Sequence, residues 1–457
     1  MQGDGFGKAK QMKETPPIVP GASLAKQGGE VRARWAWTES CVWTDRMLTA
    51  LEGGVKGGVW FSLMDKVWKQ DNLAGAFAKV KANKGGPGVD RVTAQAYGQC
   101  LEAELTRLQQ QLREGSYRPQ AIRRAWIPKD GGQKRPLGIP TVRDRVVQTA
   151  LRDVLEPIFE REFAEHSYGF RPGRSAKDAL RRVDQQLKAG LRYIVDADIQ
   201  GYFDNIPKDK LLARVRERVA DGQVLGLLEQ FLDQPIMEAL KYWTPIKGTP
   251  QGAVISPLLA NIYLNPLDHL MAGQGVEMVR YADDFVLLCQ SREQAEHALE
   301  TVRAWMEEAE LTLHPGKTRI VSMEQDGNSF EFLGYRFKRH KGRDYRFPRT
   351  KSIKRLRATI RAKTRRANAY SLERIIESIN PVLRGWFAYF KHSHETAFPE
   401  IDGWIRMRLR SILRKRHKGK GRGRGLDHLR WPNRYFTEHG LFCLTTAREQ
   451  AVQSPQG

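Results

Sequence analysis

Apolar side chains recur every three to four positions over several long stretches of the 457-residue chain. This spacing places them on one side of a helix, so it predicts amphipathic helices rather than strands. A turn-rich segment, Asn83–Gly88, separates the first two of these stretches. The predicted helices lie at residues 65–83, 98–114, 144–163, 176–188 and 292–310, and across most of 350–435.

Shorter apolar runs, bounded by turn residues, predict the strands. Residues 126–140 favour a hairpin with Asp130-Gly131-Gly132 at its tip, and Tyr193–Ile199 favours a single strand. Met278–Leu288 reads as a second hairpin whose two apolar arms flank a pair of acids. A short strand near residue 320 and a hairpin near 330–337 complete the set.

Positive charge is concentrated in one segment of the chain. The whole chain carries 76 Lys and Arg against 52 Asp and Glu, a formal net charge of +24. Residues 336–434 hold 30 of the basic and 7 of the acidic residues, so they supply almost the whole excess. A basic run alone is typical of a solvated helix face. Here aromatics such as Trp386, Phe387 and Tyr389 alternate with the cations, which favours nucleic-acid binding by phosphate neutralisation and base stacking.

The cysteines exclude two other classes of protein. Cys41, Cys100, Cys289 and Cys443 lie far apart and form no zinc-type cluster, so neither a structural zinc site nor a disulfide framework is expected. No run of about 18 apolar residues and no signal-peptide-like N-terminus occurs. We therefore expect an intracellular protein with no membrane partner.

Three acids lie at the ends or in the middle of apolar runs: Asp198, Asp283 and Asp284. Acids seldom occupy such positions unless they bind a cation or pair with a base. Two Mg²⁺ ions that activate a 3′-hydroxyl and hold a leaving pyrophosphate need carboxylates on rigid neighbouring strands. The alternative is that Asp283 and Asp284 are ordinary turn acids of a surface hairpin, and these residues alone leave both open.

The sequence around these acids resembles that of the bacterial group II intron reverse transcriptase/maturases. A single Y-x-D-D motif is a weak signal, whereas eight blocks in the family's order, across about residues 65–435, are a specific one. The blocks are Trp126–Lys129, Lys134–Pro140, Tyr168–Ser175, Asp198–Phe203, Gly248–Leu259, Tyr281–Asp284, Leu313–Thr318 and Phe332–Tyr335.

The resemblance implies a right-hand polymerase with fingers, palm and thumb and an α+β palm, followed by a mostly helical, basic maturase region. It implies two Mg²⁺ ions as cofactors. Asp198 and Asp283 would be the main metal ligands, with Asp284 in support.

The resemblance also assigns residues to the incoming nucleotide. Lys129 and Arg135 would bind the triphosphate as cations opposite phosphates. Phe203 would press against the sugar and exclude a 2′-hydroxyl, and Gln251 would lie near the nucleotide and template. Lys317 would donate a proton to the leaving pyrophosphate, and a surface lysine held in a salt bridge is the alternative.

Asn380–Phe390 resembles the maturase signature of the family. An amphipathic helix whose aromatics pack the core is the structural alternative, and Trp386 and Phe390, four residues apart, would pack in this way. Both interpretations can hold together if the cations face RNA. The candidate RNA-binding residues are Arg384, Lys391, Arg406, Arg408, Arg410 and Arg414.

The expected domains are an N-terminal extension at 1–60, partly disordered; fingers and palm at 61–340; thumb and maturase region at 341–435; and a tail at 436–457. Many family members carry a C-terminal zinc-bearing nuclease. A single cysteine after Arg434 leads us to expect none here, and with it no independent second-strand cleavage.

The expected function is RNA-directed DNA synthesis by an intron-encoded enzyme that also binds its intron RNA, assists splicing and supports mobility. Its partners would be group II intron RNA, an RNA template with a DNA primer, target DNA and deoxynucleoside triphosphates, in the bacterial cytoplasm at the nucleoid. One alternative is a group II-like enzyme recruited for defence, spacer acquisition or repair. Another is a maturase that only assists splicing, against which the intact Asp198, Asp283 and Asp284 argue.

Overall fold

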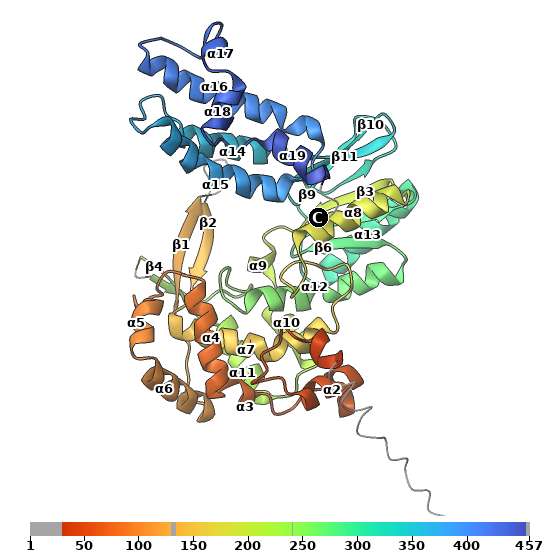
Figure 1. Cartoon of the computed structure of the whole chain (residues 1–457). Helices are drawn as coiled ribbons and strands as arrows, with labels where there is room; N and C mark the ends of the chain where they lie inside the picture. The colour runs from red at the N-terminus through yellow and green to blue at the C-terminus, as the bar shows by residue number, and fades with distance from the viewer. Residues whose placement is uncertain (1–29, 129–133, 240, 454–457) are drawn as a thin grey trace, which may run out of the picture. The chain divides into compact units, whose positions relative to one another are not determined.

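The computed structural model describes residues 30–128, 134–239 and 241–453, and the chain divides into two compact units (Figure 1). The first unit comprises Met1–Glu162 and Lys208–Ile262, and the second comprises Phe163–Pro207 and Tyr263–Gly457. Both units contain helices and strands, as the predicted α+β class requires.

The first unit is a helical body that carries one four-stranded sheet. The sheet order is β2-β1-β4-β5, antiparallel except between β1 and β4. The predicted hairpin is confirmed as β1 and β2, and its predicted tip lies outside the described residues. The strands are β1 (Ile122–Pro128), β2 (Lys134–Ile139), β4 (Ile236–Glu238) and β5 (Lys241–Trp243). The helices are α2 (Asp45–Gly53), α3 (Met64–Val67), α4 (Gln70–Ala82), α5 (Ala94–Gln99), α6 (Leu101–Arg113), α7 (Val142–Glu160), α10 (Lys208–Arg216) and α11 (Gly222–Leu232).

Helix α7 is the central helix of the first unit. The Thr141 side chain caps its start by accepting a hydrogen bond from the Asp144 backbone N at 3.1 Å. Most side chains along α7 are buried, Val146 and Leu151 among them, as expected for a helix surrounded by others.

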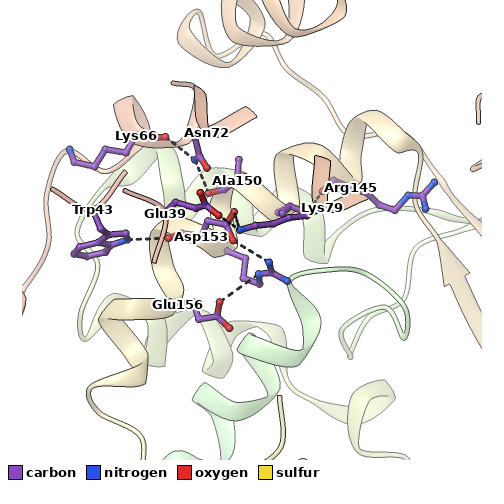
Figure 2. A network of polar contacts seen from close by, with 11 residues as sticks. Glu39, Trp43, Lys66, Asn72, Lys79, Arg145, Ala150, Asp153 and Glu156 are labelled. Atoms are coloured by element: carbon purple, nitrogen blue, oxygen red, sulfur yellow. Dashed lines mark hydrogen bonds and ion pairs between the residues drawn. The ribbon is translucent and has the colours of Figure 1, made fainter. Parts of the chain in front are cut away.

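Residues 30–60 pack against this body through a polar network (Figure 2). The fully buried Trp43 donates its indole Nε1–H to the Asp153 carbonyl oxygen of α7 at 3.0 Å. Lys79 of α4 lies 2.6 Å from a Glu39 carboxylate oxygen and 2.8 Å from one of Asp153. The predicted boundary at residue 60 therefore lies inside one packed unit, and residues 1–29 lie outside the described residues.

The second unit is built on an antiparallel sheet of order β6-β7-β3-β8. The predicted acidic hairpin is confirmed as β6 and β7, and the predicted helix 176–188 is α8, which starts with a Ser175/Asp178 capping box. The strands are β3 (Tyr193–Asp198), β6 (Glu277–Tyr281), β7 (Asp284–Cys289) and β8 (Arg319–Ser322). The helices of this part are α8 (Ala176–Lys188), α9 (Tyr202–Asn205), α13 (Arg292–Glu308) and the C-terminal part of α12 (Ser256–Gly273), whose first residues belong to the first unit.

A three-stranded sheet and a helical region follow in the second unit. The predicted 330–337 hairpin is confirmed as β9 and β10, and the predicted helices of the basic segment are confirmed. Trp386 and Phe390 lie 4.7 Å apart between ring centroids and both pack in the core, so the predicted core role of these aromatics is confirmed. The elements are β9 (Ser329–Phe332), β10 (Tyr335–His340), β11 (Arg343–Pro348), α14 (Thr350–Lys363), α15 (Leu372–Phe390), α16 (Pro399–Arg416), α17 (Asp427–Arg430), α18 (Asn433–Glu438) and α19 (Leu444–Gln453).

Among the described residues, no helix combines the length and apolar character needed to span a membrane.

Candidate active site

The strand register of the second unit brings the predicted metal ligands together. Asp198, the last residue of β3, is paired with Asp284, the first residue of β7. Because side chains alternate along a strand, Asp196 and Asp198 lie on the same face, while Val195 and Ala197 point into the core on the other. Asp196 is an acid that our sequence reasoning missed, although its spacing of two residues from Asp198 was a signal.

The turn that presents Asp283 is tight. Tyr281 pairs with Asp284, so the loop between β6 and β7 consists of Ala282 and Asp283 alone. Ala282 has a φ of +61°, which is a left-handed backbone conformation. This conformation is unfavourable for any residue other than glycine, so the turn is strained. Gly169 packs directly on this turn, because a Cβ on it would lie 2.2 Å from the Ala282 backbone N. Position 169 must therefore be glycine for the turn to keep its place.

A buried arginine holds the same turn from the strand side. Arg280 is fully buried, and its Nε donates hydrogen bonds to both carboxylate oxygens of Asp268 on α12, at 2.8 and 3.1 Å. Its Nη1 donates to the Ala282 carbonyl oxygen at 2.9 Å. Sequence reasoning missed this residue. A charged residue next to the apolar Met278 and Val279 was the available signal, because a buried charge requires a partner.

Negative charge accumulates around Asp284. Burial, together with the charges of Asp283, Asp196 and Asp198, raises the pKa of Asp284 to about 7. Burial also raises the pKa of Asp196 to about 6, although the nearby Arg319 guanidinium acts in the opposite direction. The cluster thus favours the protonated forms of Asp284 and Asp196. A cation placed here would relieve the repulsion between the carboxylates.

Hard cations such as Mg²⁺ prefer oxygen ligands, and the predicted set consists of carboxylates from adjoining strands. Within the residues that the structure describes, no three Asp, Glu, His or Cys side chains form a complete ligand group. Mg²⁺ sites in phosphoryl-transfer enzymes take one or two carboxylates and fill the remaining positions with water and substrate phosphates. The residues present therefore fit such an ion.

Lys317 lies beside the predicted metal ligands. Its Nζ is 2.6 Å from Asp198 Oδ2, and its side chain is 57% exposed. The backbone supports this arrangement, because His314 N donates to the Asp198 carbonyl oxygen at 2.7 Å. Lys317 is therefore an exposed lysine held in a salt bridge, as the alternative interpretation expected. Its partner in that salt bridge, Asp198, is a predicted metal ligand.

Phe203 lies in the same unit, on the short helix α9 that follows β3. It is 9% exposed and packs edge-on against Tyr202, with ring centroids 5.5 Å apart. The ring therefore presents only a small surface to solvent, and its action as a steric barrier stays a prediction.

The first unit brings together two of the residues predicted to bind the nucleotide. Arg135 Nε donates to Gln251 Oε1 at 2.8 Å, and the Gly138 backbone N donates to the Gln251 carbonyl oxygen at 2.6 Å. Gly252 has a φ of +105°, and a Cβ there would lie 2.4 Å from the Gly138 carbonyl oxygen. The third predicted residue, Lys129, lies outside the described residues.

The predicted RNA-binding arginines of α16 make hydrogen bonds within the protein. Arg410 is 3% exposed and donates to the Trp431 carbonyl oxygen and to Asn433 Oδ1, each at 2.8 Å. Arg408 donates to Thr364 Oγ1 and to its carbonyl oxygen, both at 2.7 Å. Burial lowers the pKa of both guanidinium groups. These two residues join α16 to neighbouring segments, and RNA binding by them would require these hydrogen bonds to break.

The other four predicted RNA-binding residues differ in exposure. Arg414 forms a salt bridge with Asp427 at 2.5 Å. Arg384 is exposed and lies over the Phe442 ring at 4.8 Å, whereas Lys391 is half-buried. The Arg406 Nε is buried and has no hydrogen-bond partner among the described residues.

Two family models match the chain. "Reverse transcriptase (RNA-dependent DNA polymerase)" matches residues 127–337, and "Group II intron, maturase-specific domain" matches residues 353–431. The first match contains the acidic hairpin of the second unit, the whole of β2 and the last two residues of β1. The second contains α15 and α16.

Curated relatives are similar to this chain over different lengths. Protein YkfC of Escherichia coli K12 is 34% identical over 322 residues, which cover 62% of this chain and 84% of YkfC. Group II intron-encoded protein LtrA of Lactococcus lactis is 39% identical over 196 residues, which cover 42% of this chain and 32% of LtrA. A chain of a solved partial Cas6-RT-Cas1–Cas2 complex is 24% identical, with a TM-score of 0.35, over 54% of this chain and 41% of that chain.

Proposed function

The chain belongs to the family of group II intron reverse transcriptases and maturases, and on this basis we propose how it works as an RNA-directed DNA polymerase. It extends a DNA primer on an RNA template with two Mg²⁺ ions, and it binds its intron RNA to assist splicing and mobility. The pairing of Asp198 with Asp284, beside the strained turn that carries Asp283, is the observation on which the proposal rests.

Asp198, Asp283 and Asp284 would hold the Mg²⁺ ions. Ions held there would supply activation of the primer 3′-hydroxyl and neutralisation of charge on the leaving pyrophosphate. Arg280 and Gly169 position the turn, so the carboxylates lie ready before substrate arrives.

Lys317 forms an ion pair with the Asp198 carboxylate, a predicted metal ligand. Its exposed ammonium group is a donor near the reacting atoms, and we assign it the proton that the leaving pyrophosphate receives. Asp198 would therefore serve both as the ion-pair partner of Lys317 and as a candidate metal ligand.

Arg135 binds the triphosphate, and Gln251 orients its guanidinium through the 2.8 Å hydrogen bond between them. Lys129 follows directly on β1 and supplies a second cation. Phe203 excludes a ribose 2′-hydroxyl by steric contact. The basic helical region binds intron RNA and target DNA through exposed cations at its surface.

Primer extension tests the proposal with Asp283→Asn. Loss of one carboxylate charge removes several kcal/mol of transition-state stabilisation, so we expect extension to fall by several orders of magnitude. RNA affinity should stay within about twofold of wild type, since the variant leaves the basic segment untouched. Asp71→Asn, an exposed acid on α4, is the matched control. Extension by Asp283→Asn at the wild-type rate would contradict the metal assignment, and splicing of the flanking RNA, measured in parallel, tests the maturase function.

A further inference from the structure

The four-stranded sheet of the first unit exposes aromatic side chains on one face. Trp126 of β1 is 46% exposed and Trp243 of β5 is 39% exposed. The register places both on the same side of the sheet. Arg124 and Trp126 are two positions apart on β1, so their side chains lie on the same face of the sheet. In the parallel pairing of β1 with β4, this face continues to Ile236 and Glu238. Trp243 of β5 pairs with Ile236 and therefore lies on the same face.

A guanidinium group lies between the two indoles. The Arg124 Cζ is 5.7 Å from the Trp126 ring centroid and 5.3 Å from the Trp243 centroid. In the part of the chain that the structure describes, no oxygen accepts a hydrogen bond from this guanidinium. Its position is therefore set by the two rings, while its donors remain available to a ligand.

The surroundings of this sheet face carry both charge signs, with cations in excess. Trp126 Nε1 donates to Glu238 Oε1 at 2.5 Å, which fixes the indole plane. Lys241 pairs with Glu238 across β4 and β5 and is exposed, and Lys134 of β2 is exposed as well. One carboxylate thus faces three cations, a balance that suits an anionic ligand.

We propose that this face, defined by Arg124, Trp126, Lys241 and Trp243, binds single-stranded RNA. Unpaired bases stack on exposed aromatic rings of an open sheet, and guanidinium and ammonium groups meet the phosphates. A double helix cannot use the rings, because its bases are already stacked. The surface adds a binding site to the proposed polymerase and requires no catalysis to be detected.

Photocrosslinking to a short single-stranded RNA that contains 4-thiouridine tests this site in the full chain, with crosslinked peptides mapped by mass spectrometry. We expect crosslinks to peptides of β1 and β5. Trp126→Ala and Trp243→Ala should each lower their yield about fivefold or more, because each removes one stacking surface. Trp243→Phe should retain most of the yield, and double-stranded RNA should give no crosslinks at these peptides.

Tyr242→Ala is the matched control, because Tyr242 is 62% exposed on the same strand but faces the other side of the sheet. The proposal is overturned if β1 and β5 yield no crosslinks, or if Tyr242→Ala lowers the yield as much as Trp243→Ala does. It is also overturned if the wild-type protein is a dimer that the tryptophan variants convert to monomer without losing RNA crosslinks. Asp283→Asn should crosslink like wild type, so a failure of the polymerase assignment remains distinguishable.

Discussion

Two hairpins carry the predicted chemistry of this protein, and they are built in opposite ways. In β6–β7 the arms are buried, and the two-residue turn is held by Arg280 and packed on by Gly169. In β1–β2 only the base of the hairpin is buried, and Trp126 and Ile127 toward its tip are each 46% exposed. The β1–β2 pair projects from the helices of the first unit (Figure 1).

The contrast follows from the charges that each hairpin carries. Carboxylates that share a metal repel one another, so only a rigid support keeps them together. Cations that bind a triphosphate attract their ligand, so they do not need a rigid support. Long, flexible side chains on an exposed hairpin can extend to the phosphates. The activity that depends on the β6–β7 hairpin should therefore be sensitive to substitutions of the residues that support it. The activity that depends on the β1–β2 hairpin should be sensitive to substitutions of its own side chains.

The largest expected effect comes from removing the support of the rigid hairpin. Arg280→Met leaves the Asp268 carboxylate buried and unpaired, which should lower the free energy of unfolding by about 3–5 kcal/mol. The double variant Arg280→Met/Asp268→Leu removes both charges and should recover most of that stability. Denaturant unfolding and primer extension, measured on both variants, separate the two roles.

If Arg280 positions the turn, the double variant should remain defective in kcat although its stability returns, because the Ala282 carbonyl still lacks its donor. Recovery of full activity together with stability would mean that Arg280 only satisfies Asp268.

The exposed hairpin should lose substrate affinity instead of kcat. Arg135→Ala removes a charge-assisted hydrogen bond to phosphate worth about 1.5–3 kcal/mol, so KM for the nucleotide should rise roughly 10- to 100-fold. Arg135→Lys should restore part of this loss of affinity, while Lys81→Ala, an exposed lysine of α4, serves as the control. Steady-state kinetics check the split, and a selective loss of kcat in Arg135→Ala would remove the distinction between the hairpins.

The same distinction applies within the basic helical region. Replacing the exposed cations Lys415, Lys420 and Arg422 with glutamine should flatten the dependence of log K on log[salt]. The slope should change by about 0.7 for each phosphate that is no longer neutralised, hence by about 2 in total. The matched triple variant replaces the internally bonded Arg408, Arg410 and Arg414 and should lower stability more than it changes the slope. RNA binding across a salt series, with thermal unfolding alongside, tests both. Equal slopes in the two triple variants would contradict this assignment.

The smallest effect concerns Glu156 in the network of Figure 2. Burial raises the pKa of this carboxyl to about 7, while the Arg152 guanidinium 3.7 Å away opposes the shift. The folded state therefore retains a proton that the unfolded chain releases near pH 4.5, so this contribution to stability falls as the pH rises from about 4.5 to 7.

Glu156→Gln should remove that dependence and stabilise the protein above pH 7 by on the order of 2 kcal/mol. Denaturant midpoints of wild type and variant across this pH range provide the measurement, with the exposed Glu307→Gln as control. Parallel curves for wild type and Glu156→Gln would show that Glu156 is ionised in both states.

Local pattern along the chain was enough to locate the main elements and to identify the acids. Helical spacing located α7, α8 and α13 to within a few residues, because it reflects local geometry, whereas the predicted helix at 65–83 is divided into α3 and α4. Asp198, Asp283 and Asp284 were recognisable because ionisable groups in apolar runs are rare, and the family assignment followed from ordered blocks along the chain.

The role of each charged side chain, by contrast, depends on the folded arrangement. Arg410 and Lys415 lie in one basic run of α16, yet their surroundings differ. Arg410 is buried and donates a hydrogen bond to the carbonyl oxygen of Trp431, whereas Lys415 is exposed. Likewise, Arg124 lies between two indoles that are 117 positions apart in the sequence, Trp126 and Trp243. Local spacing cannot specify such pairs, because the partner of a buried or stacked charge is chosen by chain segments that meet only when the protein folds.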